Sequence, residues 1–299
     1  RQRQMCIRDR ATNTPFGQRL GLVLEGGAMR GIYTAGVLDV FLEAGIMPDV
    51  VVGVSAGALH GCSYVAGQKG RSIRYYRKYR SDKHFMGLYS LLTTGDVVGT
   101  KFCYEDIPLR LDPFNEAAFE KAPVDFYVTV TNVRTGKPEY ILCDELKVGS
   151  KMDVIRAGAS MPLCSKMVEW NGNLYLDGGV SDSIPYAKMK DFGCRKSIVV
   201  LTQPAGYLKQ PAAMAPFEAM YRKYPAFVEA MRGRDQMYNT EVCAVEQAAK
   251  QGDVFLIRPS KLLHVGRMEH DIEVLNAQYE LGRQDARNQM DAMREWMER

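Results

Sequence analysis

The stretch Asp49-Val-Val-Val-Gly-Val-Ser-Ala-Gly-Ala-Leu-His-Gly61 decides the fold of this 299-residue chain. Four valines stand in an uncharged run over residues 50–54, which predicts a short and fully buried strand. Gly53-Val54-Ser55-Ala56-Gly57 forms a G-x-S-x-G pattern, and residues that favour a helix follow it. This pattern is typical of a tight strand-to-helix turn, where small neighbours let the chain pass close by. Ser55 is therefore a candidate nucleophile; the alternative is a surface serine on a small-residue turn.

A second strand with a glycine turn precedes this stretch. Residues 20–24 are apolar, and Glu25-Gly26-Gly27-Ala28-Met29-Arg30-Gly31 follows them. Apolar residues then recur at helical spacing over residues 37–42, and Gly45 ends the predicted helix. Two successive units of strand, glycine turn and helix predict an α/β fold, with three layers and a mainly parallel central sheet.

The rest of the chain supplies further predicted elements. We expect strands at 125–133, 140–143, 196–202 and 254–258, a hairpin over 167–176 turned by Asn171-Gly172-Asn173, and helices at 152–158, 217–251 and 267–299. Residues 84–120 are predicted to be rich in loops. Residues 1–18 show no periodic pattern and are expected to be a disordered or non-native arm. The predicted catalytic core spans 20–190, and residues 191–299 are expected to complete it or dock on it.

Composition excludes several classes of function. The chain is 46% hydrophobic and 25% charged, as is typical of a globular protein with a sizeable core. A net charge of +4 is too small to predict nucleic-acid binding, and no apolar run approaches the roughly 20 residues of a membrane span. The seven cysteines are scattered without a C-x-x-C pair, which favours reduced thiols in the cytoplasm and argues against a zinc site.

Two further elements can act on the same point as Ser55. The N–H groups of Gly26, Gly27 and Ala28 follow a neighbouring strand, so they can face a developing oxyanion; losing one such donor typically costs about 3 kcal/mol. Asp177 stands at the end of another predicted strand, and the two glycines after it leave room for a close approach. Serine, glycine loop and aspartate together indicate acyl-transfer chemistry.

These motifs, taken in order, resemble the patatin-like phospholipases. The resemblance rests on residues 26–31, on Gly53-Val54-Ser55-Ala56-Gly57, and on Ala159-Ser160-Met161-Pro162 leading into Tyr175-Leu176-Asp177-Gly178-Gly179. The segment 278–286 is similar to the helical tail of a bacterial branch of that family. The resemblance implies a serine acyl hydrolase with a Ser–Asp dyad, in which Ser55 is the nucleophile and Asp177 the proton acceptor.

The resemblance also implies the rest of the site. The N–H groups of Gly26, Gly27, Ala28 and Ala56 would form the oxyanion hole, and the substrate would be a phospholipid or another lipid ester. No metal or other cofactor is expected, and contact with a membrane would be peripheral. Ala28 replaces the usual third glycine of the loop and restricts its backbone. Arg30 either steers an anionic headgroup or forms a structural ion pair.

Several alternatives remain open at this point. The order Ser55, Asp177 and then His264 or His270 also fits the triad of an α/β-hydrolase. A lipid-binding module without catalysis is a second alternative. The basic, tyrosine-rich stretch 71–83 either rests on anionic lipid or forms an ordinary helix with its tyrosines inward. Segments 71–92 and 217–238 are the expected acyl-chain pocket or lid.

Overall fold

The computed structural model describes residues 14–262 and 264–299 and contains a central mixed sheet. Within these residues the strands are β1 (Arg19–Leu24), β2 (Val50–Val54), β3 (Asp125–Asn132), β4 (Pro138–Leu142), β5 (Val168–Trp170), β6 (Asn173–Asp177), β7 (Cys194–Val200) and β8 (Val254–Ile257). They lie in the order β5-β6-β3-β2-β1-β7-β8, with β4 also paired to β3. The pairs within β3-β2-β1-β7-β8 are parallel, and those of β4, β5 and β6 are antiparallel. The predicted mainly parallel sheet is confirmed.

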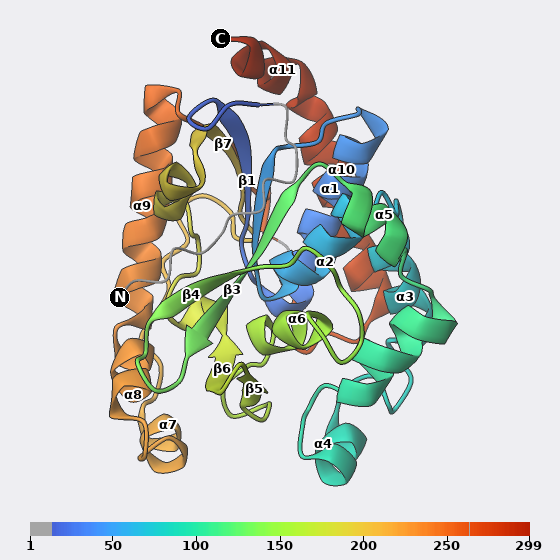
Figure 1. Cartoon of the computed structure of the whole chain (residues 1–299), viewed down its shortest axis with the longest axis vertical. Helices are drawn as coiled ribbons and strands as arrows, with labels where there is room; N and C mark the ends of the chain where they lie inside the picture. Colours follow the sequence, from blue (N-terminus) through green and yellow to red (C-terminus); the bar gives the residue numbers. More distant parts are fainter. Residues whose placement is uncertain (1–13, 263) are drawn as a thin grey trace.

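Helices cover both faces of this sheet and make three layers (Figure 1). The α-helices are α1 (Ile32–Glu43), α2 (Ala56–Val65), α3 (Arg71–Tyr79), α4 (Leu88–Thr94), α5 (Glu116–Lys121), α6 (Met152–Gly158), α7 (Ala215–Met220), α8 (Pro225–Arg232), α9 (Arg234–Gln251), α10 (Ile272–Asn288) and α11 (Met290–Glu298). Shorter 3-10 segments are η1 (Ala28–Gly31), η3 (Gly178–Val180) and η4 (Ala187–Phe192), and η2 (Phe102–Leu111) is a π-helix. In Figure 1, α9 lies on one side of the strands and α1, α2 and α10 on the other.

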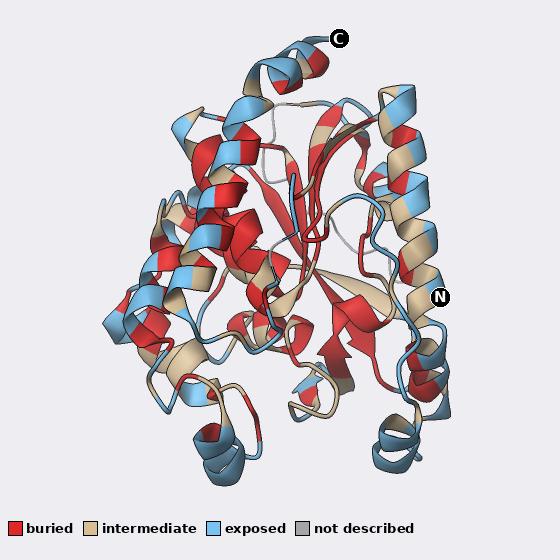
Figure 2. Cartoon of the chain, turned by 180° about the vertical axis from the view of Figure 1, so that it is seen from behind, coloured by how far each residue is buried: buried red, intermediate tan, exposed pale blue. Residues whose placement is uncertain are grey.

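The valine and leucine strands are buried on both faces, because side chains alternate between the two layers. Leu22 and Leu24 join the apolar cluster under α1 and α2, whereas Val23 and Val52 join the cluster that contains Val245 of α9. Figure 2 shows the central strands as buried along their length. This pattern explains why the strands contain uninterrupted apolar runs.

The register of β3 brings the ends of β2 and β6 together. Val54, the last residue of β2, pairs with Thr129, and Asp177, the last residue of β6, pairs with the next residue, Val130. The opposite edge of β3 is taken by β4, which pairs with Thr129 and Val130 as well. Ser55 follows Val54 directly, so the serine and the aspartate emerge beside each other.

Some predicted elements differ from the structure. Residues 84–120 are not mainly loop, because α4, η2 and α5 lie there; these short helices lack a clear apolar period and are held by tertiary contacts. Residues 217–251 contain the end of α7 and all of α8 and α9; residues 221–224 and Gly233 separate these helices. The expected arm of 1–18 lies outside the described residues up to residue 13; beyond it, Thr14 donates a hydrogen bond to Asp49, and the Gly17 N–H to Gly193 O.

Candidate active site

The turn that carries Ser55 has a strained backbone and crowded surroundings. Ser55 has φ 52°, in the left-handed region that non-glycine residues rarely occupy. A Cβ at Gly53 would lie 2.5 Å from Ala58 Cα, and one at Gly57 would lie 2.3 Å from Leu24 O. The glycines of the G-x-S-x-G pattern therefore permit close packing of β2, β1 and α2, and they hold Ser55 at the start of α2.

Ser55 and Asp177 form a direct hydrogen bond. Ser55 Oγ donates to Asp177 Oδ2 at 2.6 Å, and the Gly179 N–H donates to Asp177 Oδ1 at 2.8 Å. The backbone of Asp177 is held as well, because its N–H donates to Ser160 O and its carbonyl accepts from Thr131 Oγ1. Both carboxylate oxygens therefore have a partner, and the side chain is aimed at the serine.

Burial changes the proton affinity of this carboxylate. Removal from water raises the pKa of Asp177, whereas the hydrogen bond from Ser55 and the positive charge of Arg234 oppose that rise in the pKa. Arg234 begins α9, and its Nε donates to Gly179 O at 2.5 Å. A carboxylate with a raised pKa binds a proton more readily, which suits a group that accepts one from a serine.

The glycine loop places backbone donors beside Ser55. A Cβ at Gly26 would lie 2.9 Å from Ser55 Cβ, so the loop and the serine are in close contact. Ala28 and Ala56 are the first residues of η1 and α2, where N–H groups have no acceptor within the helix. Ala28 has φ 48° and thus adopts the left-handed conformation that its usual glycine would take without strain.

A buried carboxylate, Glu25, anchors this loop. It accepts hydrogen bonds from the Thr202 N–H at 2.5 Å and from Tyr238 OH at 3.0 Å. Thr202 follows β7 and Tyr238 belongs to α9, so the loop after β1 is tied to two elements of the C-terminal third of the chain. Burial raises the pKa of Glu25.

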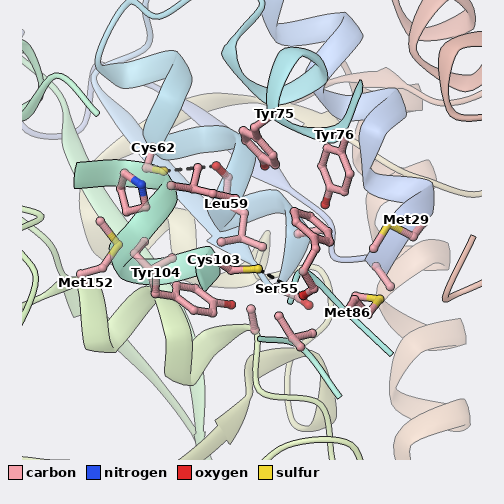
Figure 3. A pocket seen from close by; sticks show the side chains of 18 of the residues that line it. Met29, Ser55, Leu59, Cys62, Tyr75, Tyr76, Met86, Cys103, Tyr104 and Met152 are labelled. Carbon is pink, nitrogen blue, oxygen red and sulfur yellow. Dashed lines mark hydrogen bonds between the residues drawn. The ribbon is translucent and has the colours of Figure 1, made fainter. Parts of the chain in front are cut away.

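An apolar cavity opens on one side of Ser55 (Figure 3). Its walls come from α2, α3, η2 and α6 and from the segments that flank α4, and Figure 3 shows the side chains around it. Among its lining residues are Leu59, Tyr75, Tyr76, Met86, Cys103, Tyr104, Ile107 and Met152. The segment 71–92, expected to line an acyl-chain pocket, contributes to this wall.

A second, more polar cavity opens on the other side of Ser55. It contains Ser55 and Asp177 together with Glu25, the glycine loop and several cations. The segment 217–238 contributes here, through Phe217, Met231, Arg234 and Tyr238. Arg30 also lines this cavity, and within the described residues it has no carboxylate at ion-pair distance.

The histidines lie apart from the serine and the aspartate. His60 is buried with its Nδ1 3.0 Å from Ser72 Oγ, and burial lowers the pKa of His60 to about 3. His264 and His270 are exposed. Within the described part of the chain, no histidine forms a hydrogen bond with Ser55 or Asp177. This arrangement favours the dyad over the triad.

The basic stretch 71–83 packs as an ordinary helix. In α3, Tyr75, Tyr76 and Tyr79 are buried, and Arg74 pairs with Asp112 at 2.6 Å. The reading in which the tyrosines pack inward therefore fits this helix.

Sequence reasoning missed the parts of the site that have no local pattern. Arg234, Lys209 and Arg267 reach the polar cavity from segments far from both motifs. Glu25 directly precedes the glycine loop in the sequence. An acidic residue at the end of an apolar strand could have indicated a buried carboxylate at this site. For the three cations only the folded arrangement is informative.

Comparison with known proteins identifies the family of this chain. The family model of the patatin-like phospholipases matches residues 22–189, which is more than half of the chain and includes the end of β1, the serine turn and Asp177. The chain belongs to the patatin-like phospholipase family. Membership in this family supports the function of a lipid hydrolase. A second model, described as a domain of unknown function (DUF6363), matches residues 224–298.

Individual relatives of this patatin-like chain differ in length. The uncharacterized protein YjjU of Escherichia coli is 28% identical over 273 residues, which cover 89% of this chain and 75% of YjjU. Lysophospholipase nte1 of Aspergillus terreus is 30% identical over 182 residues, which cover 59% of this chain and only 11% of that protein. The solved structure of VipD from Legionella pneumophila aligns with 93% of this chain and 67% of its own, at 13% identity and a TM-score of 0.46.

Across residues 14–262 and 264–299, no helix of this patatin-like chain is both long enough and apolar enough to cross a membrane.

Proposed function

We propose that this chain is a serine acyl hydrolase that cleaves acyl esters of phospholipids or lysophospholipids through Ser55 and Asp177. The observation that carries the proposal is the 2.6 Å hydrogen bond from Ser55 Oγ to Asp177 Oδ2 on a strained strand-to-helix turn. The similarity to lysophospholipase nte1 supports lipid esters as substrates.

The reaction proceeds in two steps. Ser55 Oγ attacks the ester carbonyl while its proton passes to Asp177, and the departing alcohol takes that proton as the acyl-enzyme forms. Asp177 then removes a proton from the water that attacks the acyl-enzyme, and it returns this proton to Ser55 Oγ as the bond to the acyl group breaks and the fatty acid leaves. The N–H groups of Gly26, Gly27, Ala28 and Ala56 stabilise the oxyanion in both steps.

The acyl chain occupies the apolar cavity between α2, α3, η2 and α6. Tyr76, Met86 and Cys103 are among its lining residues, and the cavity begins at Ser55 itself (Figure 3). Methionines suit this role because their flexible side chains adapt to the chain that they contact.

Peripheral contact with a lipid surface involves α4 in this proposal. Leu88 and Leu92 are 70% and 77% exposed, and α4 projects from the body of the molecule (Figure 1). Met86 and Val98 lie on either side of α4, pair with each other, and line the apolar cavity. A lipid that leaves a membrane beneath α4 therefore has a short apolar path to Ser55.

The dyad is tested by hydrolysis of a short-chain p-nitrophenyl ester. We expect Ser55→Ala and Asp177→Asn to lose at least about 10³-fold in turnover, whereas a His264→Ala/His270→Ala double variant keeps it. Circular dichroism establishes that each variant is folded. Loss of activity in the folded histidine variant would replace the dyad with a triad, and a wild type inactive on every ester would favour a lipid-binding module.

A further inference from the structure

The polar cavity beside Ser55 collects cations from four separate segments. Arg30 comes from η1, Lys209 from the loop after β7, Arg234 from the start of α9, and Arg267 from the loop before α10. Two carboxylates, those of Glu25 and Asp177, are among the described residues that line it. With all six groups ionised, the cavity would carry an excess of two positive charges.

Neither carboxylate neutralises these cations by a direct ion pair. Asp177 is engaged by Ser55 and Gly179, and Glu25 by Thr202 and Tyr238. Among the salt bridges of the described residues, none includes Arg30, Lys209, Arg234 or Arg267.

Within the described residues, the side-chain contacts of these cations are with a backbone carbonyl and an aromatic ring, and none is with a carboxylate. Arg234 Nε donates to a backbone carbonyl, that of Gly179, and Lys209 Nζ lies 4.1 Å from the centroid of the Tyr238 ring. Arg30 Nε is buried and, within the described residues, has no hydrogen-bond partner.

The cations are close enough to affect one another. Burial, and then the positive charge of Arg234, lowers the pKa of Lys209 to about 7, while Glu25 acts in the opposite direction. Burial lowers the pKa of Arg234 too; the charge of Asp177 opposes this change in the pKa, and the charges of Arg267 and Arg30 add to it. Grouping like charges in a partly buried cavity is unfavourable, and such grouping is typical of a site that binds the opposite charge.

The position of Ser55 indicates which anion fits. With an acyl chain in the apolar cavity and its carbonyl at Ser55, the alcohol side of the ester points into the polar cavity. Guanidinium groups bind phosphate oxygens through paired hydrogen bonds, and a phosphate monoester carries a charge near −2 at neutral pH. A quaternary ammonium headgroup would instead meet the cations.

We propose that Lys209, Arg234 and Arg267, together with Arg30, form a phosphate subsite that selects lipid esters with an anionic headgroup over those with a zwitterionic one. This inference rests on the proposed function and specifies its substrate class. Lysophospholipids that end in a phosphate monoester are the best match to the charge of the cavity.

The first test measures binding without catalysis. Glycerol 3-phosphate and glycerol are titrated into the Ser55→Ala protein by calorimetry, with and without Lys209→Gln/Arg267→Gln. We expect glycerol 3-phosphate to bind and glycerol not to bind, and the double substitution to weaken binding about tenfold or more. Lys250→Gln/Arg195→Gln is the matched control, since it removes the same charge at the opposite end of the sheet and should leave binding unchanged.

The second test compares substrates that share one acyl chain. Lysophosphatidate, lysophosphatidylcholine and monoacylglycerol are supplied as monomers, and kcat/KM is compared as a ratio between headgroups. We expect wild type to favour lysophosphatidate over lysophosphatidylcholine about tenfold or more, and Lys209→Gln/Arg267→Gln to abolish most of that ratio. Thermal unfolding shows that the variant is folded.

The outcomes separate this inference from the proposed function. If the Ser55→Ala protein binds glycerol 3-phosphate but wild type cleaves no ester, the phosphate subsite is supported and the proposed hydrolase activity is overturned. An active wild type whose headgroup ratio is unaffected by the double substitution overturns the subsite. Inorganic phosphate that binds as tightly as glycerol 3-phosphate, with no headgroup preference in hydrolysis, would replace a lipid subsite with one for free phosphate.

Discussion

Asp177 combines burial with a cationic neighbour, and both affect the pH at which it can accept a proton. In the proposed mechanism Asp177 must be ionised to accept a proton, so activity is expected to fall as the pH drops below the pKa of Asp177. Because burial raises the pKa of Asp177 from the ordinary 3.8, we expect the acidic limb of kcat/KM to lie above pH 3.8. Removing the opposing charge by Arg234→Gln should move this limb further towards neutral pH.

The control for this pH shift is Arg232→Gln. Arg232 lies two residues away and is paired on the surface with Glu218 and Glu229. Its substitution should leave the acidic limb in place. A limb that does not move in Arg234→Gln would show that Arg234 does not influence the catalytic carboxylate.

Ala28 lies in the proposed oxyanion loop, at a backbone position that favours glycine. At φ 48° an alanine is disfavoured by about 1 kcal/mol. Glycine would relieve this strain but would increase the conformational entropy of the unfolded chain, which lowers stability by a comparable amount. We therefore expect Ala28→Gly to keep activity and to change the free energy of unfolding by less than about 1 kcal/mol.

The β-branched substitution Ala28→Val is the contrasting variant. Valine is strongly disfavoured at positive φ, so the loop should shift and misalign its N–H groups, with a loss of about 10²-fold in kcat. Urea unfolding and ester hydrolysis measure both effects. Full activity in Ala28→Val would show that the loop geometry does not limit the reaction.

At the level of elements, α4 presents exposed leucines, and the segments that flank it line the apolar cavity. Burying two leucines in a lipid surface is worth a few kcal/mol, so Leu88→Ser/Leu92→Ser should reduce binding to phospholipid vesicles about tenfold or more. Co-sedimentation with vesicles measures this directly. Hydrolysis of vesicle lipid should fall more than hydrolysis of a soluble ester.

Met47→Ser is the matched control for α4. Met47 is 39% exposed and precedes β2, at the end of the sheet opposite to Ser55. Its substitution should not affect vesicle binding. Equal losses in both variants would point to a general effect of surface apolarity, against a specific role for α4.

The elements predicted from the sequence are those whose pattern is local. The valine run of β2 and the Asn171-Gly172 turn between β5 and β6 each contain their own signal, and Asn171 and Gly172 both have the positive φ that such a hairpin turn requires. The helices α4, η2 and α5 carry no comparable signal, since η2 even contains Pro108. Their conformation depends on packing around the apolar cavity.

The same distinction holds for the site. Ser55, Asp177 and the glycine loop belong to short motifs, so the sequence predicts them. The role proposed for Lys209, Arg234 and Arg267 depends on their proximity in the folded chain. A single cation in a polar segment of the sequence does not predict a binding site.

At the scale of the whole molecule, the C-terminal helices pack tightly against the first helix. A Cβ at Gly282 of α10 would lie 2.1 Å from Tyr33 O, and one at Gly36 of α1 would lie 2.1 Å from Tyr279 O. Tyr33 OH also donates to Asp285 Oδ2 at 3.0 Å. In addition, β7 lies between β1 and β8, so residues 191–299 take part in the same sheet.

We therefore predict that the whole chain unfolds as one unit. Gly282→Ala should force α1 and α10 apart and lower the free energy of unfolding by about 2 kcal/mol, whereas Glu280→Ala, on the exposed side of α10, should change it little. Chemical denaturation followed by both fluorescence and circular dichroism should give one shared transition. Two separate transitions would show that the C-terminal part folds independently.

The pairing of β2 and β6 to neighbouring residues of β3 sets the spacing of the proposed nucleophile and base without help from residues 71–111. This spacing follows from the distance between Thr129 and Val130, which are adjacent residues of one strand. Residues 71–111, which form much of the wall of the apolar cavity, lie in the sequence between Ser55 and Asp177 but outside the strands that align them. Such a layout is modular: exchanging this insert with that of a relative would transfer acyl-chain preference while the reacting pair stays in register.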